Sequence, residues 1–593
     1  MNKKQVSVAM IISLALIVVS FAVVRAAPET QGEITPVSWI MAIIVGLFYY
    51  ASMSPWFANL GFTTLYRPLI AGTLVGLVMG QPGRGVAIGA NINVLYLGWI
   101  SAGGSLPGDP GLAGYLGTAL ALGGGLGTEA ALAVAAPLGL LGGLTWSLRM
   151  SLCSIIPHWS ERFAEEGDID GVARSNYIYS QPFLFVIYAI PVILAAKFGS
   201  SAVAAGLNWI AANAIWVMNG LYAASGMLAA LGIALNLKFL LRGTVWPYFF
   251  IGFLVPLLLG GPVNLLVMAI IGAAVAFLHV LFTEGLGGSE EVGAAEEERK
   301  AVGLLTKNDV FQSFWRWLCF SHSTYNWERM QGLGFAHSMT PIIRKLYKSK
   351  EDISAALKRH LIFYNTQPDA GGIVNGIVIA MEEERAAGAE ISDDAINSVK
   401  TGLMGPMAGI GDTLQQGILI PIALSLGMSV ALGGNIAEAQ TGNLLGPILY
   451  VILMMVGTWG GGWVLYWQGY KQGRTAVTNI LRSGTLNKVI VGAGVLGNFI
   501  MGALVISFVS LSTPVALMIG GTAFRIQSIF DSFMPNLLPL LLVLLIWWLL
   551  AKKNVSPTTI MIVVIIVGVL GAVPIWPGID AETNEVIRVG LLG

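Results

Sequence analysis

The sequence predicts an all-α polytopic membrane protein with two membrane domains, broken or re-entrant helices, and an amphipathic helical segment between the domains. Hydrophobic residues make up 55% of the 593 residues and charged residues only 11%, whereas soluble domains carry about 25% charged residues. Apolar runs long enough to cross a bilayer lie on both sides of a charged stretch between residues 300 and 400. Many of the 74 glycines lie within these runs, where glycine weakens helices and favours breaks.

Composition excludes several classes of function. Positive and negative charges balance and no basic tract occurs, so we expect no nucleic-acid partner. Cys153 and Cys319 have no CxxC-type partner, and the five histidines are scattered, so we expect neither a disulfide framework nor a metal site. No Walker loop for a nucleotide occurs. We therefore expect no cofactor and no catalytic residue on this chain.

The first half divides into an N-terminal segment, residues 1–36, and a membrane domain, residues 37–282. Lys3 and Lys4 precede an apolar stretch of about 19 residues, which is either a retained first helix or a signal peptide. In the membrane domain, the Gly-rich run 69–80 is too short to span before the turn residues around Pro82. This run therefore predicts a broken or re-entrant helix.

An acidic, Gly-rich linker at residues 283–305 separates this domain from a second one at 306–593. In the second domain, residues 306–400 are predicted to form mainly amphipathic helices and residues 401–593 the membrane portion. Ser349 and Ser392 are predicted helix starts, because serine caps helix N-termini. The glycines between 402 and 411 are expected to break up the path to Asp412, where an apolar run begins that Asp412 could cap as a helix start.

Polar side chains at apparent membrane depth are the candidate binding residues. An unsatisfied polar group costs several kcal/mol in lipid, so such residues usually line a pathway. Asn and Gln donate and accept in pairs and Asp accepts from hydroxyls, which suits an uncharged sugar. The candidates are Asn91 and Asn93, Asp109, and a group made of Asn365, Gln367, Asp412, Gln415 and Gln416.

Each candidate also has a purely structural alternative. Asn91 and Asn93 could bond free backbone groups at a broken helix. Asp109 could be an ordinary turn aspartate in its Pro-Gly-Asp-Pro setting. Asp412 could be a simple N-cap, a role that is compatible with ligand binding.

Two sets of motifs resemble a known family. The second half resembles the IID component of the mannose-class bacterial phosphotransferase permeases. Its matching stretches are Asn326-Trp327-Glu328-Arg329-Met330-Gln331, Leu333-Gly334-Phe335, Arg359-His360-Leu361, Asn365-Thr366-Gln367-Pro368, Gly388-Ala389-Glu390-Ile391, Ala395-Ile396-Asn397, Gly402-Leu403-Met404-Gly405-Pro406 and Ala408-Gly409-Ile410-Gly411-Asp412. The first half resembles the IIC component through Arg67-Pro68-Leu69-Ile70, Thr73-Leu74-Val75-Gly76, Leu97-Gly98-Trp99 and the spacing to Asp109.

The resemblance implies a fused IIC and IID sugar permease in the bacterial cytoplasmic membrane. It implies an elevator-like movement, a homotrimer in membrane lipid, and soluble IIB and IIA partners, with the phosphoryl group carried by IIB. It further implies that the sugar is held around Asn365, Gln367 and Asp412, with help from Asn91, Asn93 and Asp109. Arg67 of the Arg-Pro motif joins these candidate residues.

The chain departs from the family pattern at two places. Asn93 stands where the IIC component typically has Glu, and Gly61-Phe62 stand where an acidic pair is common. Both changes remove carboxylates and leave the identity of the sugar open. An amide-rich site would suit an amino sugar, an acylated sugar or a sugar acid. The alternatives are an uncoupled facilitator or secondary transporter on the same scaffold, and a membrane receptor.

Overall fold

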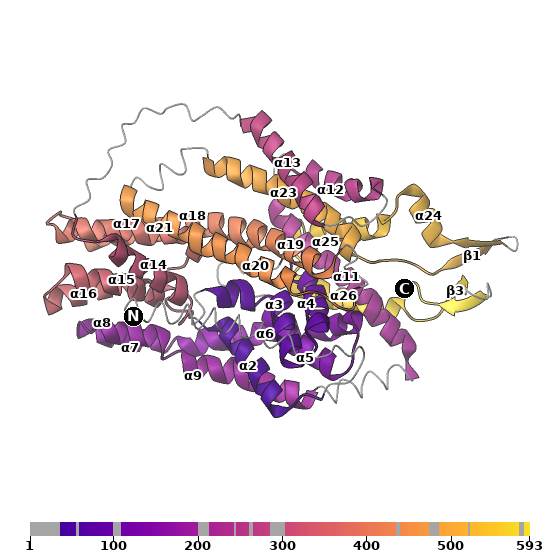
Figure 1. Cartoon of the computed structure of the whole chain (residues 1–593), viewed down its shortest axis with the longest axis horizontal. Helices are drawn as coiled ribbons and strands as arrows, with labels where there is room; N and C mark the ends of the chain where they lie inside the picture. The colour runs from indigo at the N-terminus through magenta and orange to yellow at the C-terminus, as the bar shows by residue number, and fades with distance from the viewer. Residues whose placement is uncertain are drawn as a thin grey trace.

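The computed structural model of the protein describes residues 36–54, 59–98, 108–199, 213–241, 245–259, 265–284, 303–433, 439–473, 485–519, 522–579 and 586–592. The predicted N-terminal helix and most of the predicted linker lie outside these described residues. Helices dominate the described part of the chain (Figure 1), which confirms the predicted fold class.

The described part of the first half consists of short and long helices with two π-helical turns. Its elements are α2 (Trp39–Met53), η3 (Gly61–Leu65), α3 (Pro68–Val78), α4 (Pro82–Leu95), α5 (Pro110–Gly123), α6 (Thr128–Cys153), α7 (Ile156–Glu165), α8 (Ile169–Tyr177), α9 (Gln181–Leu184), η5 (Phe185–Ala189), α11 (Ile215–Leu240), α12 (Pro247–Leu258) and α13 (Leu265–Glu284).

The described part of the second half adds more helices and two β-hairpins. Its helical elements are α14 (Lys307–Phe320), α15 (Gly332–Leu346), α16 (Lys350–His360), α17 (Pro368–Ala386), α18 (Asp393–Leu414), η6 (Gln415–Leu419), α19 (Ile420–Leu432), α20 (Leu445–Met455), η7 (Val456–Gly461), α21 (Gly462–Gln472), α23 (Thr485–Phe508), α24 (Ile526–Phe533), α25 (Leu537–Ala551) and α26 (Pro557–Gly571). The antiparallel hairpins pair β1 (Ala516–Ile519) with β2 (Thr522–Arg525) and β3 (Trp576–Ile579) with β4 (Val586–Val589). These hairpins are absent from the sequence prediction.

Three described helical stretches are long and apolar enough to cross a membrane. They are Ile169–Gly199, Asp393–Leu432 and Leu445–Gln472, and a fourth span results if α24 and α25, which meet at a bend of 80°, count as one. Shorter apolar helices such as α2, α3 and α12 accompany them. This mixture of full spans and short helices matches the predicted broken helices.

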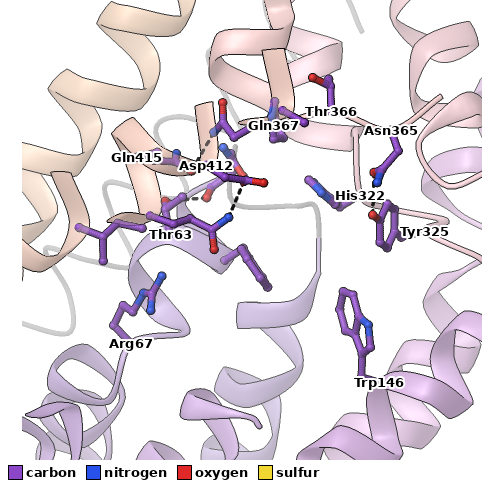
Figure 2. Close-up of a pocket in the computed structure, with 16 residues that line it drawn as sticks. Thr63, Arg67, Trp146, His322, Tyr325, Asn365, Thr366, Gln367, Asp412 and Gln415 are labelled. Atoms are coloured by element: carbon purple, nitrogen blue, oxygen red, sulfur yellow. Dashed lines mark hydrogen bonds between the residues drawn. The ribbon is translucent and has the colours of Figure 1, made fainter. Parts of the chain in front are cut away.

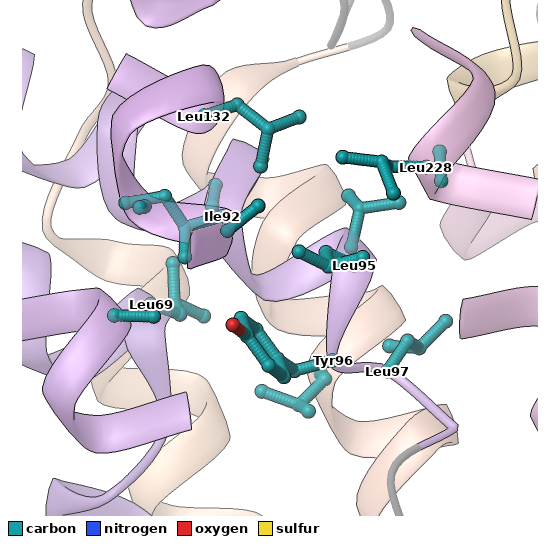
Figure 3. Packing of buried hydrophobic residues seen from close by; sticks show 14 of the residues in the cluster. Leu69, Ile92, Leu95, Tyr96, Leu97, Leu132 and Leu228 are labelled. Carbon is teal, nitrogen blue, oxygen red and sulfur yellow. The ribbon is translucent and has the colours of Figure 1, made fainter. Parts of the chain in front are cut away.

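Helices α3 and α4 form the broken pair that the Gly-rich run predicts. The two helices are in close contact at their glycines. A Cβ atom added to Gly72 would lie 2.6 Å from the backbone oxygen of Gly85, and a Cβ atom added to Gly89 would lie 2.4 Å from the backbone oxygen of Pro68. The absence of side chains lets the two backbones approach closely. Leu69 of α3 and Ile92 of α4 pack beside Leu132 of α6 in the buried cluster (Figure 3).

The two halves of the chain share one apolar core. Helix α11 of the first half packs against α23, α25 and α26 of the second, while α12 and α13 pack against α23 (Figure 1). A second cluster joins α7 and α8 of the first half to α14–α17 at the other end of the molecule. Each of these two buried clusters is therefore built from both halves of the sequence. The predicted domain boundaries divide the sequence, and they stay a prediction.

Two predicted helix starts are confirmed and one is wrong. Ser349 caps α16 and Ser392 caps α18 through their side-chain oxygens. Asp412 does not begin a helix, because α18 continues through Pro406 and the neighbouring glycines to Leu414. Gly402, Gly405 and Gly409 lie within this helix, and a Cβ atom added at any of them would meet open space. Close packing against a neighbouring element therefore does not require glycine at these positions.

Buried ion pairs around Glu382 connect α17 with α16 and, through Arg359, with α18. The fully buried Glu382 carboxylate accepts from Arg359 Nε at 2.8 Å and lies 3.1 Å from His360 Nε2, while Arg359 also bonds Asp393 at 2.7 Å. Burial raises the pKa of Glu382, but His360 and Arg359 outweigh it and hold that pKa at about 2. Burial lowers the pKa of His360 to about 4, although Glu382 opposes that shift.

We predict that the protein loses stability as the pH falls from 7 towards 4. Both folded pKa values lie below the ordinary values of 4.5 and 6.5, so the unfolded chain takes up protons first and the stabilisation is complete only above pH 6.5. Glu382→Gln should lower stability at pH 7 by about 3–5 kcal/mol, because Arg359 loses its buried partner. Thermal unfolding of the purified protein between pH 7 and 4 measures this.

The exposed Glu390 provides the control, since Glu390→Gln should leave the unfolding temperature and its pH dependence unchanged. Equal unfolding temperatures for Glu382→Gln and the wild type at pH 7 would contradict the role of this ion pair.

Candidate substrate-binding site

A pocket lies where the two halves of the chain meet (Figure 2). Its empty volume is about 680 Å³, including the part that is open to solvent. The first half supplies the turn η3, the start of α3 and part of α6, and the second half supplies the loop after α14, the start of α17 and the continuous helix α18–η6–α19. The lining residues are Asn59, Phe62, Thr63, Arg67, Trp146, His322, Tyr325, Asn365, Thr366, Gln367, Pro368, Ala408, Asp412, Gln415, Gln416 and Ile420.

π-Helical turns form two walls of the pocket. Phe62 and Thr63 lie on η3, and Gln415 and Gln416 lie on η6. π-Turns are rare and occur frequently at functional sites, because the extra residue in the turn changes the direction of the side chains. Here Gln415 of η6 reaches Gln367 and Asp369 at the start of α17, while Gln416 bonds Asp412 of α18.

Hydrogen bonds determine which end of the Gln367 and Gln415 amides is the oxygen and which is the nitrogen. A backbone N–H can only donate, so Gln367 Oε1 accepts the Ala370 N–H at 2.7 Å, as the cap of α17. Gln367 Nε2 therefore faces Gln415 and donates to its Oε1 at 2.8 Å. Gln415 Nε2 in turn donates to the side-chain oxygen of Asp369.

Gln331 fixes the opposite wall. Its Oε1 accepts the Thr366 backbone N–H at 2.9 Å, so its Nε2 must be the atom that donates to Thr366 O at 2.8 Å and to His322 Nε2 at 2.9 Å. His322 consequently carries its proton on Nδ1. Burial first, and the charge of Arg149 second, lower the pKa of His322 to about 3.

Two further pairs complete the polar lining. Tyr325 donates its hydroxyl to Asn365 Oδ1 at 2.7 Å, and Gln416 Nε2 donates to Asp412 Oδ1 at 2.6 Å. In Figure 2, Asp412 and Gln367 lie at the second-half wall, while Arg67 points into the pocket from the first half. Arg67 has this position because the residue before a proline is extended, which places it at the start of α3.

Aromatic rings line one side of the pocket. Trp146 lies 5.9 Å from Tyr325, and Phe62 stacks on His322 with ring centroids 6.2 Å apart. Such rings offer a flat apolar surface beside convergent polar groups, which is the usual composition of a small-molecule site. The pocket can therefore hold a small hydroxylated molecule through hydrogen bonds on one side and apolar contact on the other.

Six of the sequence-predicted residues come together in this pocket. They are Asn365, Gln367, Asp412, Gln415, Gln416 and Arg67.

Asn91, Asn93 and Asp109 lie outside this pocket. Asn91 Nδ2 donates to Ala87 O of its own helix at 2.9 Å, and the Leu69 backbone N–H reaches Asn93 Oδ1 at 3.4 Å. Asp109 caps α5 through Leu112 at 2.8 Å and accepts the Tyr49 hydroxyl at 2.5 Å. These contacts correspond to the structural alternatives for the three residues, namely backbone partners for the asparagines and a turn or cap role for Asp109.

Several pocket residues are absent from the sequence prediction. Trp146, His322 and Tyr325 reach the pocket only through tertiary packing, although Tyr325 adjoins the Asn326–Gln331 motif. Asp369 does carry a signal, since a carboxylate follows Gln367-Pro368 directly in the chain. It lies behind Gln415 and acts on the pocket through that side chain.

A double-mutant cycle tests the chain of amides. Gln415→Ala and Asp369→Ala should each lower the free energy of unfolding by about 1–3 kcal/mol, because each leaves a buried polar partner unsatisfied. The double variant should lose less than the sum, with a coupling of about 0.5–3 kcal/mol. Denaturation of the purified protein in detergent measures the cycle, and effects that add within about 0.5 kcal/mol would show that the two side chains do not interact.

Two family descriptions cover most of this chain. "PTS system sorbose-specific iic component" matches residues 39–278, and "PTS system mannose/fructose/sorbose family IID component" matches residues 304–575. The chain is also 38% identical to a chain in a solved structure of a mannose transporter with microcin E492, covering 45% of this chain and 96% of that one with a TM-score of 0.27.

Individual relatives match each half separately. The sorbose-specific EIID component of Lacticaseibacillus casei is 40% identical over 241 residues, which is 40% of this chain and 82% of that protein. The mannose-specific EIID component of Escherichia coli K12 is 40% identical over 244 residues, with 40% and 83% covered. The mannose-specific EIIC component of the same organism is 31% identical over 217 residues, with 36% and 79% covered. The chain therefore belongs to the mannose/fructose/sorbose family of phosphotransferase permeases and unites a IIC and a IID component in one membrane polypeptide.

Proposed function

We propose that this chain is the sugar-translocating unit of a phosphoenolpyruvate-dependent phosphotransferase system in the bacterial cytoplasmic membrane. A separate IIB protein, phosphorylated through IIA, transfers its phosphoryl group to a hydroxyl of the incoming sugar. The bond from phosphorus to the carrier residue breaks as the bond to the sugar oxygen forms. The observation that carries this proposal is the pocket at the junction of the IIC and IID components, lined by buried hydrogen-bonding groups from both.

The pocket lining supports an elevator-like translocation. The wall formed by α18, η6 and α19 belongs to the second half, whereas Arg67 and Trp146 belong to the first. Movement of one wall past the other would open the pocket first to one side of the membrane and then to the other. Large apolar side chains such as Phe277 and Phe282 of α13 are 60% and 82% exposed, which is consistent with contact to lipid or to further copies in a homotrimer.

Asn365, Gln367, Asp412, Gln415, Gln416 and Arg67 are the proposed sugar contacts. Gln367 is 3% exposed and Arg67 is 4% exposed. Burial keeps water from the second N–H of Gln367 Nε2 and from Arg67 Nε, so an occupant of the pocket can accept hydrogen bonds from them. Asn91, Asn93 and Asp109 support the α3–α5 scaffold in this proposal.

Uptake into proteoliposomes tests the proposed function. The purified chain is reconstituted with phosphoenolpyruvate, the general phosphotransferase proteins and its IIA and IIB partners, and labelled mannose, fructose, sorbose and glucosamine are supplied. Label should enter only when IIB is phosphorylated, and it should be recovered inside as the sugar phosphate. Accumulation of free sugar without a phosphoryl donor would indicate a facilitator, and binding without entry would indicate a receptor.

Asn365→Ala and Gln367→Ala should each raise the KM for the transported sugar about tenfold. The loss of a buried polar partner costs about 1–3 kcal/mol, and 1.4 kcal/mol corresponds to a factor of ten. Asn91→Ala is the matched control, because that amide bonds only its own helix among the described residues. An unchanged KM for both pocket variants, or an equal rise for Asn91→Ala, would contradict the proposed position of the sugar.

A further inference from the structure

A second cavity adjoins the pocket and shares part of its wall. It holds about 420 Å³ of empty space, and Asn59, Phe62, Trp146 and His322 line both cavities. Its remaining wall contains Arg149 of α6 and several serines at the ends of α2 and α14. A ligand whose ring occupies the main pocket can therefore extend a substituent past Trp146 and His322 into this space.

Arg149 is a buried cation with an incomplete set of partners. Its side chain is 2% exposed; Nη2 donates to His322 O at 2.5 Å, and the guanidinium lies 5.1 Å from the centre of the Trp146 ring. Its Nε has no hydrogen-bond partner, and no carboxylate in the described part of the chain forms an ion pair with it. A buried charge without a counter-charge is costly, and planar guanidinium groups match carboxylate and phosphate oxygens.

The two cavities together have an excess of positive charge. Among their lining residues the charged side chains are Arg67, Arg149 and Asp412, so two cations face one carboxylate. The Nε of Arg67 also lacks a hydrogen-bond partner. His322 adds no charge, because its Nε2 accepts from Gln331. An occupant that carries one negative charge would balance this lining.

The serines of the second cavity differ in what they can donate. Ser52 donates its hydroxyl to Tyr49 O at 2.7 Å and Ser323 donates to Asn176 O at 2.6 Å, so their protons are already used. Ser321 Oγ lies 3.3 Å from His322 Nδ1, which carries the ring proton. Ser321 therefore accepts this bond and keeps its own O–H free for a ligand oxygen.

We propose that the second cavity binds an anionic group on the carbohydrate, a carboxylate or a phosphate, through the Arg149 guanidinium and the Ser321 hydroxyl. This inference rests on the proposed function, because it assumes a sugar ring in the main pocket. A carboxylate would make the transported substrate a sugar acid, whereas a phosphate would be that of the phosphorylated product before release.

Titration calorimetry on the purified full chain tests the assignment with glucose, glucuronate and glucose 6-phosphate, which share one ring. The wild type should bind at least one of the two anions about tenfold more tightly than glucose. Arg149→Gln should abolish this preference and leave glucose unaffected, Arg149→Lys should retain part of it, and Ser321→Ala should weaken it severalfold. A gain for glucuronate alone identifies a sugar acid, and a gain for glucose 6-phosphate alone identifies the product.

Inorganic phosphate provides a probe that needs no ring recognition. It should raise the unfolding temperature of the wild type and of the control Arg174→Gln, whose arginine is exposed on α8, but not that of Arg149→Gln. Equal affinity of the wild type for all three sugars, or a preference that survives both Arg149→Gln and Ser321→Ala, overturns the inference. Coupled uptake that succeeds alongside either result leaves the proposed function intact, whereas failed uptake with a preserved anion preference contradicts that function alone.

Discussion

A buried polar group is costly unless it finds a hydrogen-bond partner, and the candidate pocket is organised by that constraint. The backbone N–H of Ala370 sets the orientation of Gln367, which sets that of Gln415, which donates to Asp369. Gln331 does the same for Thr366 and His322 on the other wall. Because each amide has one permitted orientation, the pocket presents a defined pattern of donors and acceptors before any ligand binds.

The same constraint explains why the two components are interwoven. Short helices such as α3 and α4 cannot cross a bilayer, and they are tolerated because other helices bury them on all sides. The helices α11–α13 of the IIC part pack against α23, α25 and α26 of the IID part, so neither half completes its core alone. Joining both components in one chain keeps these complementary surfaces together.

Local features of the structure followed from the sequence, whereas long-range contacts did not. Serine caps predicted the starts of α16 and α18 correctly, since capping depends on neighbouring residues only. The glycines before Asp412 indicated a break, but α18 continues through them to Leu414, although Gly402, Gly405 and Gly409 have open space around them. Asn365, Gln367 and Asp412 could be predicted because they are polar residues beside apolar runs in the sequence. Trp146 and Arg149 lie near the end of the apolar helix α6, and only the folded chain brings Trp146 to the pocket and Arg149 to the second cavity.

In the proposed function, a sugar occupies the space between the α17–α18 wall and Trp146. A cryo-electron microscopy map of the chain in lipid nanodiscs with a transported sugar bound can locate this ligand. We expect ligand density within hydrogen-bond distance of Gln367 and Asp412, with one face of the sugar against Trp146. Ligand density outside this pocket, with the side chains of Gln367 and Asp412 pointing away from it, would show that the proposed position of the sugar is wrong.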